Sequence, residues 1–474
     1  MPEREPAASS GSGTVDAVPL IVSRKGGGVI DVSAPIASPA SPAVNEAALL
    51  GEQLTHTAPA GEDRPRVSAT YIWLVVLATF GTIVALVGPV GYSLSVLISR
   101  IAPQNQEFLG YVTGVGALVV VLAGPIVGVL SDRTRSRLGR RRPWIIGLTL
   151  VGVVGLLVVS VSPNVWVAVL GWAITQFGFG IAALQVTSSM GDRLPESQRG
   201  KVAGLTGVAT MVASIAGVIL ASAFASSNLL IFLVPGLVGA VLILLFAIVI
   251  KEPDMRTAAT AEKVTARSLA RGYVYNVRKY TDFSWNWLGR FLFNFGVTLS
   301  TTFTTFFLAS KLNLPVDQLG GIVAISGLIG VLSTVGGAAL SGFLSDRLKR
   351  RKSFILVAGI LFAVGAVIAW LGPDLIVFLV GMGILQFGLG IFSAVDQALY
   401  LDVLPEQDTQ AGRFVAINQF STSIPQFAAP LIAPVFLLIG SGSASNNYGL
   451  LYMIAAGFAL VGGLVILLRV KSVR

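Results

Sequence analysis

The stretch that decides the fold is GVLSDRTRSRLGRR at residues 128–141, which returns as GFLSDRLKRR at residues 342–351. In each copy an apolar segment ends in Gly-x-Leu-Ser-Asp-Arg and then runs into a cluster of arginines. The serines of the two copies, Ser131 and Ser345, are 214 positions apart, and the first copy carries four additional loop residues.

Two further segments repeat in the same order. QFGFGI at residues 176–181 returns as QFGLGI at residues 386–391, which is 210 positions later. Asp192, followed shortly by Leu-Pro-Glu, returns at the same spacing as Asp402 with its own Leu-Pro-Glu. Chance would rarely preserve order and spacing across three segments, so the sequence predicts a duplicated chain with two related halves.

The composition sets the class of protein. The chain has 474 residues, of which 54% are hydrophobic and 12% are charged, and its mean hydropathy is +0.80. An average soluble domain is about 25% charged, so a soluble globular enzyme is excluded. Cysteine is absent, and the single histidine, His56, lies in a polar N-terminal segment. We therefore expect no enzyme, no metal site and no cofactor.

From Thr70 onward, apolar stretches follow one another, each long enough to cross ~30 Å of hydrocarbon as a helix. We expect an all-α integral membrane protein with twelve transmembrane helices in two pseudo-symmetric six-helix halves. The expected spans lie near residues 70–97, 108–130, 143–160, 164–190, 202–225, 229–250, 284–310, 318–344, 353–371, 375–401, 412–438 and 447–468.

The spans divide the chain into four parts. Residues 1–69 are rich in Ala, Ser, Pro, Gly and Val without a helical period, so we expect a disordered cytoplasmic leader. Residues 70–250 form the expected N-terminal half, and residues 284–470 form the C-terminal half. The polar residues 251–283 between them are expected to be a cytoplasmic linker.

The basic residues predict the orientation in the membrane. They gather in the loops after the second and eighth spans and in the linker, whereas the opposite side carries only Arg100 and Lys311. The positive-inside rule then places the basic loops and both termini in the cytoplasm, with the chain in the inner (plasma) membrane. The formal net charge of +10 is thus a topology signal, and no nucleic-acid partner is expected.

The repeated loop resembles the signature loop of the major facilitator superfamily. Its longer first copy, SDRTRSRLGRRRP at residues 131–143, resembles the loop of glycoside–cation symporters, especially sucrose–proton symporters. The resemblance implies a secondary transporter that works by alternating access, with spans one, four, seven and ten lining a central cavity. Sucrose carriers have a buried arginine on the fourth span, where this chain offers Gln185 and Thr187.

The repeated loops carry a candidate gating motif. Four aspartates stand beside arginines where spans meet the cytoplasm, and such clusters can hold helices together in one conformation and separate in another. The alternative is an orientation signal with exposed ion pairs worth about 0–1 kcal/mol each. The motif residues are Gly128, Asp132, Arg133, Gly139, Arg140, Arg141, Gly342, Asp346, Arg347, Asp192 and Asp402.

Two charges are expected deep within lining spans. Asp396 precedes the cytoplasmic end of the tenth span by about two turns, and Arg290 lies equally far into the seventh. Ionisable groups inside a membrane usually pair, face a cavity and mark a substrate or proton route. We expect an Asp396–Arg290 pair in which Asp396 is the proton carrier. The alternative is a permanent pair that fixes two helices together.

Amide side chains on the lining spans are the substrate candidates: Gln176, Gln185, Asn294 and Gln386. Amides donate and accept hydrogen bonds, which suits hydroxyl-rich substrates. The alternative for Gln176 and Gln386 is a bond to a neighbouring helix, because both lie in the repeated glycine-rich motif.

The favoured function is symport of a sugar or similar small polar solute with protons, by a monomer in the lipid bilayer. One alternative is a proton-antiport exporter of drugs or lipophilic compounds on the same fold. A second is a weakly transporting transceptor or scaffold. No ATP-binding motif occurs in the sequence.

Overall fold

The computed structural model describes residues 65–253, 255, 275–406, 411–439 and 446–472. Residues 1–64 of the leader expected at residues 1–69 therefore lie outside the described residues. Most of the linker expected at residues 251–283 does so as well.

The first half of the described chain is built from helices joined by short turns. α2 continues through a π-helical segment into α3, and α6 continues through another into α7. The helices are α2 (Ala69–Gly88), α3 (Leu94–Ile101), α4 (Leu109–Asp132), α5 (Arg142–Ser160), α6 (Val165–Thr175), α7 (Ile181–Arg193), α8 (Glu196–Ser222) and α9 (Leu230–Val249).

The second half repeats this plan with one break, which lies between α11 and α12. Its helices are α11 (Thr281–Thr302), α12 (Thr304–Leu312), α13 (Gly320–Leu348), α14 (Arg351–Leu371), α15 (Leu375–Val403), α16 (Ala411–Leu438) and α17 (Tyr448–Arg469). The described residues contain no β-strand.

The number of spans agrees with the sequence prediction. Within the described residues, eleven helices are long and apolar enough to cross a membrane, and the pair α11 and α12 makes the twelfth when counted as one span. The fold is therefore all-helical, with twelve spans in two six-helix halves. The fifth span begins at Glu196, six residues before the expected start, because the polar first turns of α8 extend beyond its apolar part.

The bend of 47° between α11 and α12 was not predicted. Around the bend, three threonine hydroxyls donate to the backbone carbonyl four residues earlier. The bonds run from Thr301 to Val297, from Thr302 to Thr298 and from Thr304 to Ser300. Such bonds compete with the helical ladder and bend helices. The threonine-rich sequence thus accounts for the break at this position.

The two halves use equivalent residues to begin their fourth helices. Asn164 caps α6 by accepting from the Val167 N–H at 3.1 Å, and Asp374 caps α15 by accepting from the Val377 N–H at 2.9 Å. The two caps are 210 positions apart, the spacing of the sequence repeat. A side-chain oxygen at this position satisfies one of the free N–H groups at a helix start.

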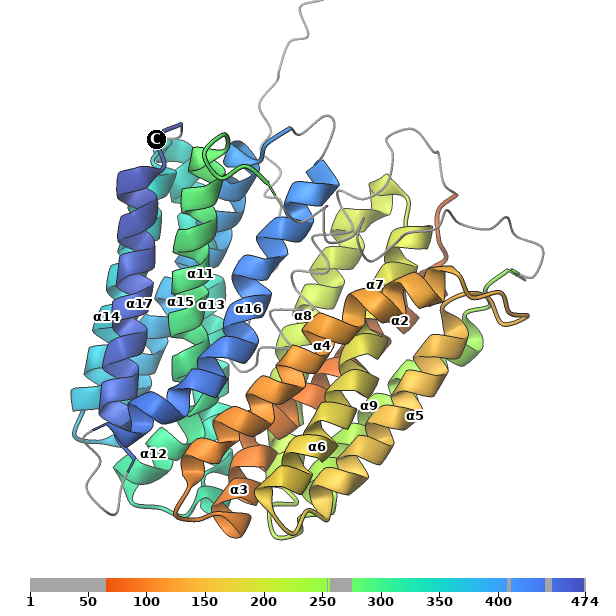
Figure 1. Ribbon diagram of the computed structural model, residues 1–474, viewed down its shortest axis with the longest axis horizontal. Coiled ribbons are helices and arrows are strands. Elements are labelled where there is room, and N and C mark those ends of the chain that lie inside the picture. The colour runs from red at the N-terminus through yellow and green to blue at the C-terminus, as the bar shows by residue number, and fades with distance from the viewer. Residues whose placement is uncertain (1–64, 254, 256–274, 407–410, 440–445, 473–474) are drawn as a thin grey trace, which may run out of the picture. The chain divides into compact units, whose positions relative to one another are not determined.

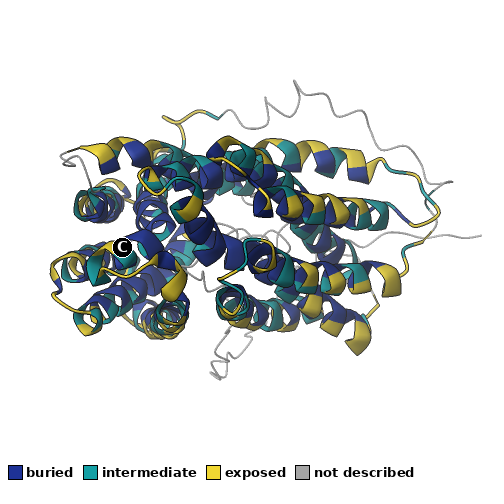
Figure 2. Cartoon of the chain, turned by 90° about the horizontal axis from the view of Figure 1, so that it is seen from below, coloured by how far each residue is buried: buried dark blue, intermediate teal, exposed yellow. Residues whose placement is uncertain are grey.

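Small residues let the helices of one half approach closely. A Cβ on Gly178 would come within 2.2 Å of the Gly152 nitrogen on α5, and one on Gly390 within 2.1 Å of the Thr334 oxygen on α13. The outward faces carry exposed apolar side chains such as Leu122 and Ile376, and Figure 2 shows exposed residues on the outer sides of the helices. These faces suit lipid rather than water, so the chain is a multi-pass membrane protein.

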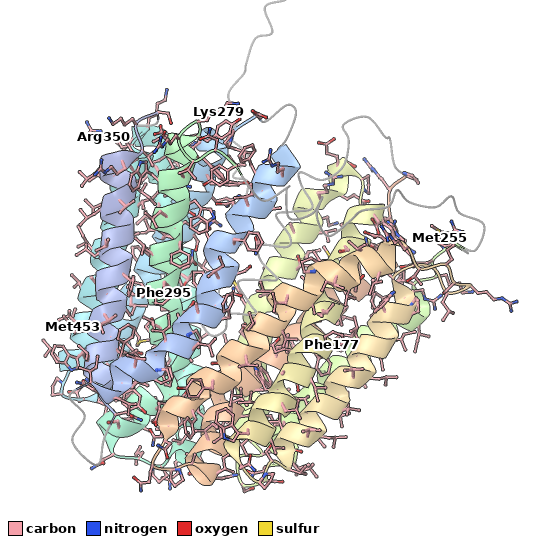
Figure 3. All side chains as sticks on the ribbon, in the orientation of Figure 1. Phe177, Met255, Lys279, Phe295, Arg350 and Met453 are labelled. Atoms are coloured by element: carbon pink, nitrogen blue, oxygen red, sulfur yellow. The ribbon has the colours of Figure 1, made fainter. Side chains whose placement is uncertain are left out.

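The helices have two distinct ends. We call the end at which α4 and α13 finish the motif end, and the opposite end the far end; Arg350 and Lys279 lie at the motif end (Figure 3). The two halves touch where α4 packs against α16 (Figure 1). They also touch where α8 packs against α13.

Hydrogen bonds and an ion pair join the halves at the far end. The Tyr92 hydroxyl donates to the Asp317 carbonyl at 2.7 Å, and the Tyr448 hydroxyl donates to the Gln106 amide oxygen at 2.6 Å. Arg100 lies 3.5 Å from the Asp317 carboxylate. The structure therefore represents a conformation in which the far ends of the two halves are in contact.

Candidate functional site: a transport pathway between two halves

The motif of the first half surrounds Arg141. Its Nε donates to Asp192 and its Nη2 to Asp132, both at 2.8 Å. Its Nη1 donates to the Ser131 hydroxyl at 3.0 Å and to the Gln185 amide oxygen at 3.1 Å. All three guanidinium nitrogens of this buried arginine are therefore bonded, which ties α4, α5 and α7 together.

The loop before Arg141 is held by the chain that follows α9. Gly139 has φ +94°, and a Cβ there would fall 2.2 Å from Glu252. Only glycine combines this positive φ with so close a contact between the loop backbone and Glu252. The Glu252 carboxylate accepts from the Arg141 N–H at 2.9 Å, while Arg140 pairs with Asp192 at 2.7 Å. Glu252 was missed by the sequence analysis, because nothing in the linker marks it as a partner of the loop.

The motif of the second half is a smaller version of the first. Arg351 pairs with Asp402 and lies 3.6 Å from Asp346. Its side chain is 25% exposed, whereas that of Arg141 is 8% exposed. The sequence analysis named Arg347 instead, but that side chain is exposed. The missed signal is the spacing, since Arg351 follows Arg141 by 210 positions, as Asp402 follows Asp192.

The two other glycines of the motif make no close contact in this conformation. A Cβ on Gly128 or on Gly342 would meet no atom within 4 Å, so packing does not require glycine at either position. Arg133 is exposed at the end of α4. The ion pairs described for the two motifs join helices of the same half. Their role in gating therefore stays a prediction.

The deep pair expected from the sequence is present in the structure. The Arg290 Nη1 lies 2.9 Å from the Asp396 Oδ2, and both residues are buried. Asp396 lies seven residues before the end of α15 and Arg290 nine residues into α11, which is about 10 Å and about 13 Å from the motif end of their helices. The Arg290 guanidinium also lies 5.7 Å from the centre of the Tyr400 ring.

This pair is incompletely hydrogen-bonded. The Arg290 Nε and the Asp396 Oδ1 are buried and have no hydrogen-bond partner within the described part of the chain. The same is true of both amide atoms of Asn286, which lies one turn before Arg290 on α11. The sequence analysis did not name Asn286, although its spacing of four residues from Arg290 places the two on one helix face.

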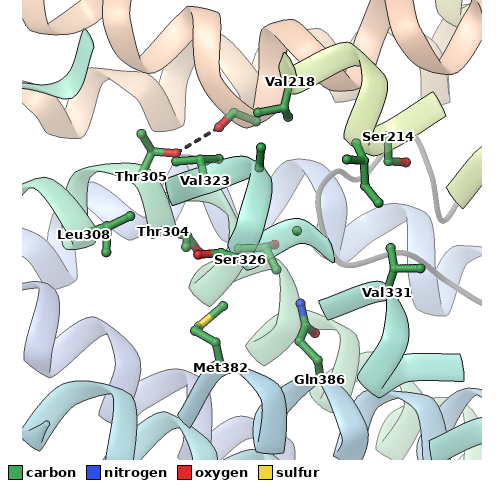
Figure 4. Close-up of a pocket in the computed structure, with 15 residues that line it drawn as sticks. Ser214, Val218, Thr304, Thr305, Leu308, Val323, Ser326, Val331, Met382 and Gln386 are labelled. Atoms are coloured by element: carbon green, nitrogen blue, oxygen red, sulfur yellow. Dashed lines mark hydrogen bonds between the residues drawn. The ribbon is translucent and has the colours of Figure 1, made fainter. Parts of the chain in front are cut away.

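A cavity of about 70 Å³ lies between the two halves (Figure 4). It is on the far-end side of the deep pair, because Gln386 in its lining precedes Asp396 by ten residues, or about 15 Å of helix. Its lining combines five hydroxyls and one amide with seven apolar side chains and two glycines. The residues are Ser214, Thr301, Thr304, Thr305, Ser326 and Gln386, with Ile215, Val218, Leu308, Val323, Ala324, Val331 and Met382, and Gly91 and Gly327.

The sequence matches the model of the Major Facilitator Superfamily over residues 69–430 and again over residues 332–474. The chain belongs to this superfamily. Its superfamily is one of membrane transporters and not of enzymes. The resemblance expected from the repeated loop is confirmed.

Curated relatives of this transporter match over short segments. The general alpha-glucoside permease of Schizosaccharomyces pombe is 29% identical over 117 residues, which is 25% of this chain and 21% of the permease. Solute carrier family 45 member 3 of Homo sapiens is 36% identical over 77 residues, or 16% of this chain and 14% of the carrier. The chain thus covers about a fifth or less of the length of these relatives.

Solved structures of the superfamily share the fold. The crystal structure of the nucleoside transporter NupG superimposes with a TM-score of 0.63, at 11% identity, over 89% of this chain and 99% of that one. At this identity the likeness concerns the fold alone.

The structure separates the four amides expected to bind substrate in this superfamily member. Gln386 lines the cavity. Gln176 lies in the π-helical segment Gln176–Gly180, where a Cβ on Gly116 would fall 3.0 Å from its side chain. Gln185 bonds to Ser131 and Arg141, and Asn294 donates to the Arg290 carbonyl at 2.9 Å. Only Gln386 of the four is among the cavity residues, and contact with substrate stays a prediction for all of them.

The hydroxyls of the cavity were missed by the sequence analysis. Thr301, Thr304 and Thr305 come from the bend between α11 and α12, which turns adjacent threonines toward one space. The signal in the sequence is the run TTFTT at residues 301–305, although a run of threonines alone does not show which side it faces.

Proposed function

We propose that this protein moves a sugar or a similar neutral polar solute across the membrane together with protons, by alternating access between its two halves. The observation that carries the proposal is the arrangement along the pathway. A neutral, hydroxyl-lined cavity lies between the halves, and one buried acid–base pair lies between that cavity and the motif end.

The lining hydroxyls favour a substrate rich in hydrogen-bond donors. Each of the five hydroxyls can donate to a backbone carbonyl, and that of Thr304 also bonds to the Tyr452 hydroxyl at 3.1 Å. Donation to the backbone leaves oxygen lone pairs that can accept from a substrate. The amide oxygen of Gln386 has no hydrogen-bond partner in the described structure. The hydroxyl groups of a sugar supply the matching donors. The bonds run from Ser214 to Thr210, Thr301 to Val297, Thr304 to Ser300, Thr305 to Gly91 and Ser326 to Ile322, at 2.8–2.9 Å.

The charge of the lining favours a neutral substrate. None of the fifteen residues that line this cavity is ionisable. The general alpha-glucoside permease, a relative over 25% of this chain, is named for a sugar substrate and supports a sugar here. A second candidate function, export of lipophilic compounds in exchange for protons, is supported by the seven apolar side chains in the same lining.

Asp396 is the proposed proton carrier. When its carboxylate is ionised, the attraction to Arg290 holds α15 to α11. A proton on Asp396 removes that attraction and leaves the two helices free to rearrange. Binding and release of the proton would in this way alternate with movement of the two halves.

The membrane orientation is proposed from the charges. By the positive-inside rule, the basic loops favour a cytoplasmic motif end, with both chain termini on the cytoplasmic side of the inner (plasma) membrane. The halves at residues 70–250 and 284–470, joined by a linker at 251–283 and preceded by the leader 1–69, would act as a monomer. The exposed charges of the two motifs would gate the motif end, while Arg141 itself keeps α4, α5 and α7 together.

The experiment that tests the proposal uses the full chain in lipid nanodiscs and in proteoliposomes. Maltose, sucrose, glucose and the cation tetraphenylphosphonium are each tested for a rise in the melting temperature. Solutes that stabilise are then tested for uptake driven by an imposed pH gradient. We expect stabilisation by at least one sugar, and uptake that a protonophore abolishes. Stabilisation by the cation alone supports the exporter. Sugar uptake that ignores the pH gradient contradicts proton coupling.

A further inference from the structure

Asn286 is a fully buried amide with no visible reason to be polar. Its relative exposure is 0%, and neither its nitrogen nor its oxygen has a hydrogen-bond partner within the described residues. An unsatisfied buried polar group costs about 1–3 kcal/mol. A leucine would fill this position without that cost, so the amide calls for a partner of its own.

The face that carries Asn286 points toward α15. Residues four apart on a helix are neighbours, so Asn286 and Arg290 share one face. Further along this face, Phe293 stacks on Phe392 of α15, with ring centres 3.6 Å apart. Arg290 itself reaches Asp396 of α15. Asn286 thus lies next to the pair, on its motif-end side.

The unpartnered atoms define what fits among them. The Asn286 amide offers its two N–H donors and its acceptor oxygen. The Arg290 Nε offers a donor, and the Asp396 Oδ1 offers an acceptor. The charges of the pair cancel, the guanidinium repels a metal cation, and the carboxylate repels an anion. A small neutral molecule that both donates and accepts satisfies the set, and water does so with the ~3 hydrogen bonds typical of a buried water.

The other groups around this site are few. Tyr400 of α15 lies on the motif-end side, with its ring against the Arg290 guanidinium. α17 meets α11 through Ile466, and α16 meets it through Phe414 and the Ile417 carbonyl. Beyond them toward the motif end, Asp282 of α11 lies near Lys352 of α14. Among the described residues, these contacts place Arg290, Asp396 and Tyr400 as the ionisable groups at the site.

We propose that Asn286 holds a buried water through which Asp396 exchanges its proton with the motif end. The Asp396 carboxyl gives its proton to this water while the water gives one to a further water on the motif-end side, which carries it to the solvent, so the buried water is regenerated. Asn286 is a positioning residue, since it fixes the water and does not itself change protonation. The inference rests on the proposed role of Asp396 as proton carrier.

The first test needs no substrate. Infrared difference spectra are recorded between acid and alkaline pH on the full chain in nanodiscs. They contain the C=O band of each carboxyl that becomes protonated. The band that is missing from the spectra of Asp396→Asn belongs to Asp396. In Asn286→Leu we expect this band to shift and its proton exchange after a pH jump to slow by about tenfold or more. Asn286→Ser, which retains a hydroxyl, restores the wild-type band.

Thr149→Val is the matched control. Thr149 is fully buried on α5 and donates to its own helix at 2.7 Å, so the band should stay unchanged in this variant. If Asp396→Asn removes no band, the proposed role of Asp396 fails. If the band is present but Asn286→Leu changes neither its position nor its exchange rate, only the water site is overturned.

A second measurement covers the case in which the spectra are crowded. In proteoliposomes, Asn286→Leu should slow pH-driven uptake of the solute selected above by about tenfold. Exchange of that solute across the membrane without a pH gradient should continue at the wild-type rate. An equal loss of uptake and exchange contradicts a role in proton transfer, and the melting temperature shows whether the variant folds.

Discussion

Two arginines of this transporter are buried to the same degree and bonded in opposite ways. Arg141 is 7% exposed and Arg290 is 6% exposed. Each guanidinium nitrogen of Arg141 has a partner, and two carboxylates balance its charge. Arg290 has one carboxylate, and its Nε has no hydrogen-bond partner in the described structure.

The difference indicates different roles. Arg141 is surrounded by bonds that would all be lost together, as expected of a structural junction between α4, α5 and α7. Arg290 and Asp396 retain unused hydrogen-bonding capacity, as expected of a site that changes partners during a cycle. Burial of a charge alone therefore does not mark a functional group, whereas burial with unsatisfied atoms makes the group a candidate for function.

The largest effect on stability is expected for Arg141→Met. Removing one member of a buried ion-pair network leaves the charges of the other members uncompensated. This lowers the free energy of unfolding by about 3–5 kcal/mol. Asp132 and Asp192 would both lose their bonds to it. The measurement is the free energy of unfolding in lipid or detergent, with Arg137→Met, an exposed position in the same loop, as the control. A loss below about 1 kcal/mol would contradict the structural role of Arg141.

The double variant Arg290→Met with Asp396→Leu should fold about as well as the wild type. Replacing a whole buried ion pair by apolar residues is often neutral or stabilising by about 1–4 kcal/mol. Uptake driven by a pH gradient should nevertheless be lost. Unfolding measurements and the proteoliposome assay check the two parts separately. A severe loss of stability would show that the pair is a structural junction like that of Arg141.

Arg351→Met should lower the free energy of unfolding by about 1 kcal/mol or less. Arg351 and its partners are more exposed than Arg141 and its partners, and water screens exposed ion pairs. Arg351 is the counterpart of Arg141 in the sequence repeat, so comparison of the two variants isolates the effect of burial. Equal losses of unfolding free energy for both variants would show that burial does not decide the strength of these clusters.

The smallest effect is expected at an exposed pair outside the spans. The Tyr280 hydroxyl and Lys279 beside Glu406 hold the pKa of that carboxyl below its usual range. Because the folded-state pKa is lowered, the stabilisation is present at neutral pH and is lost as the pH falls through the lowered value. Glu406→Gln should therefore lower the melting temperature slightly at about pH 7 and not at about pH 3. An equal difference at both pH values would refute a contribution from ionised Glu406.

The sequence was sufficient for the span pattern, the duplication and the deep pair. Long apolar stretches predict spans because the hydrocarbon thickness sets their length. Asp396 and Arg290 stood out because charge inside a span is costly and demands a partner.

Features that depend on which side a residue faces could not be predicted. The break between α11 and α12 arises from several threonine bonds acting together, and the cavity hydroxyls follow from that bend. Asn286 is an ordinary amide in the sequence and becomes informative only when its two unsatisfied atoms are seen. Glu252 reaches the motif loop through the path of the chain after α9, which local sequence does not specify.

The most direct test of the account is proton movement driven by the solute. Proteoliposomes that contain a pH-sensitive dye receive a gradient of the solute selected by the uptake assay, and the internal pH is followed for the wild type and for Asp396→Asn. We predict that solute entry changes the internal pH in the wild type, while Asp396→Asn equilibrates the solute without moving protons. Proton movement that persists in Asp396→Asn would contradict it.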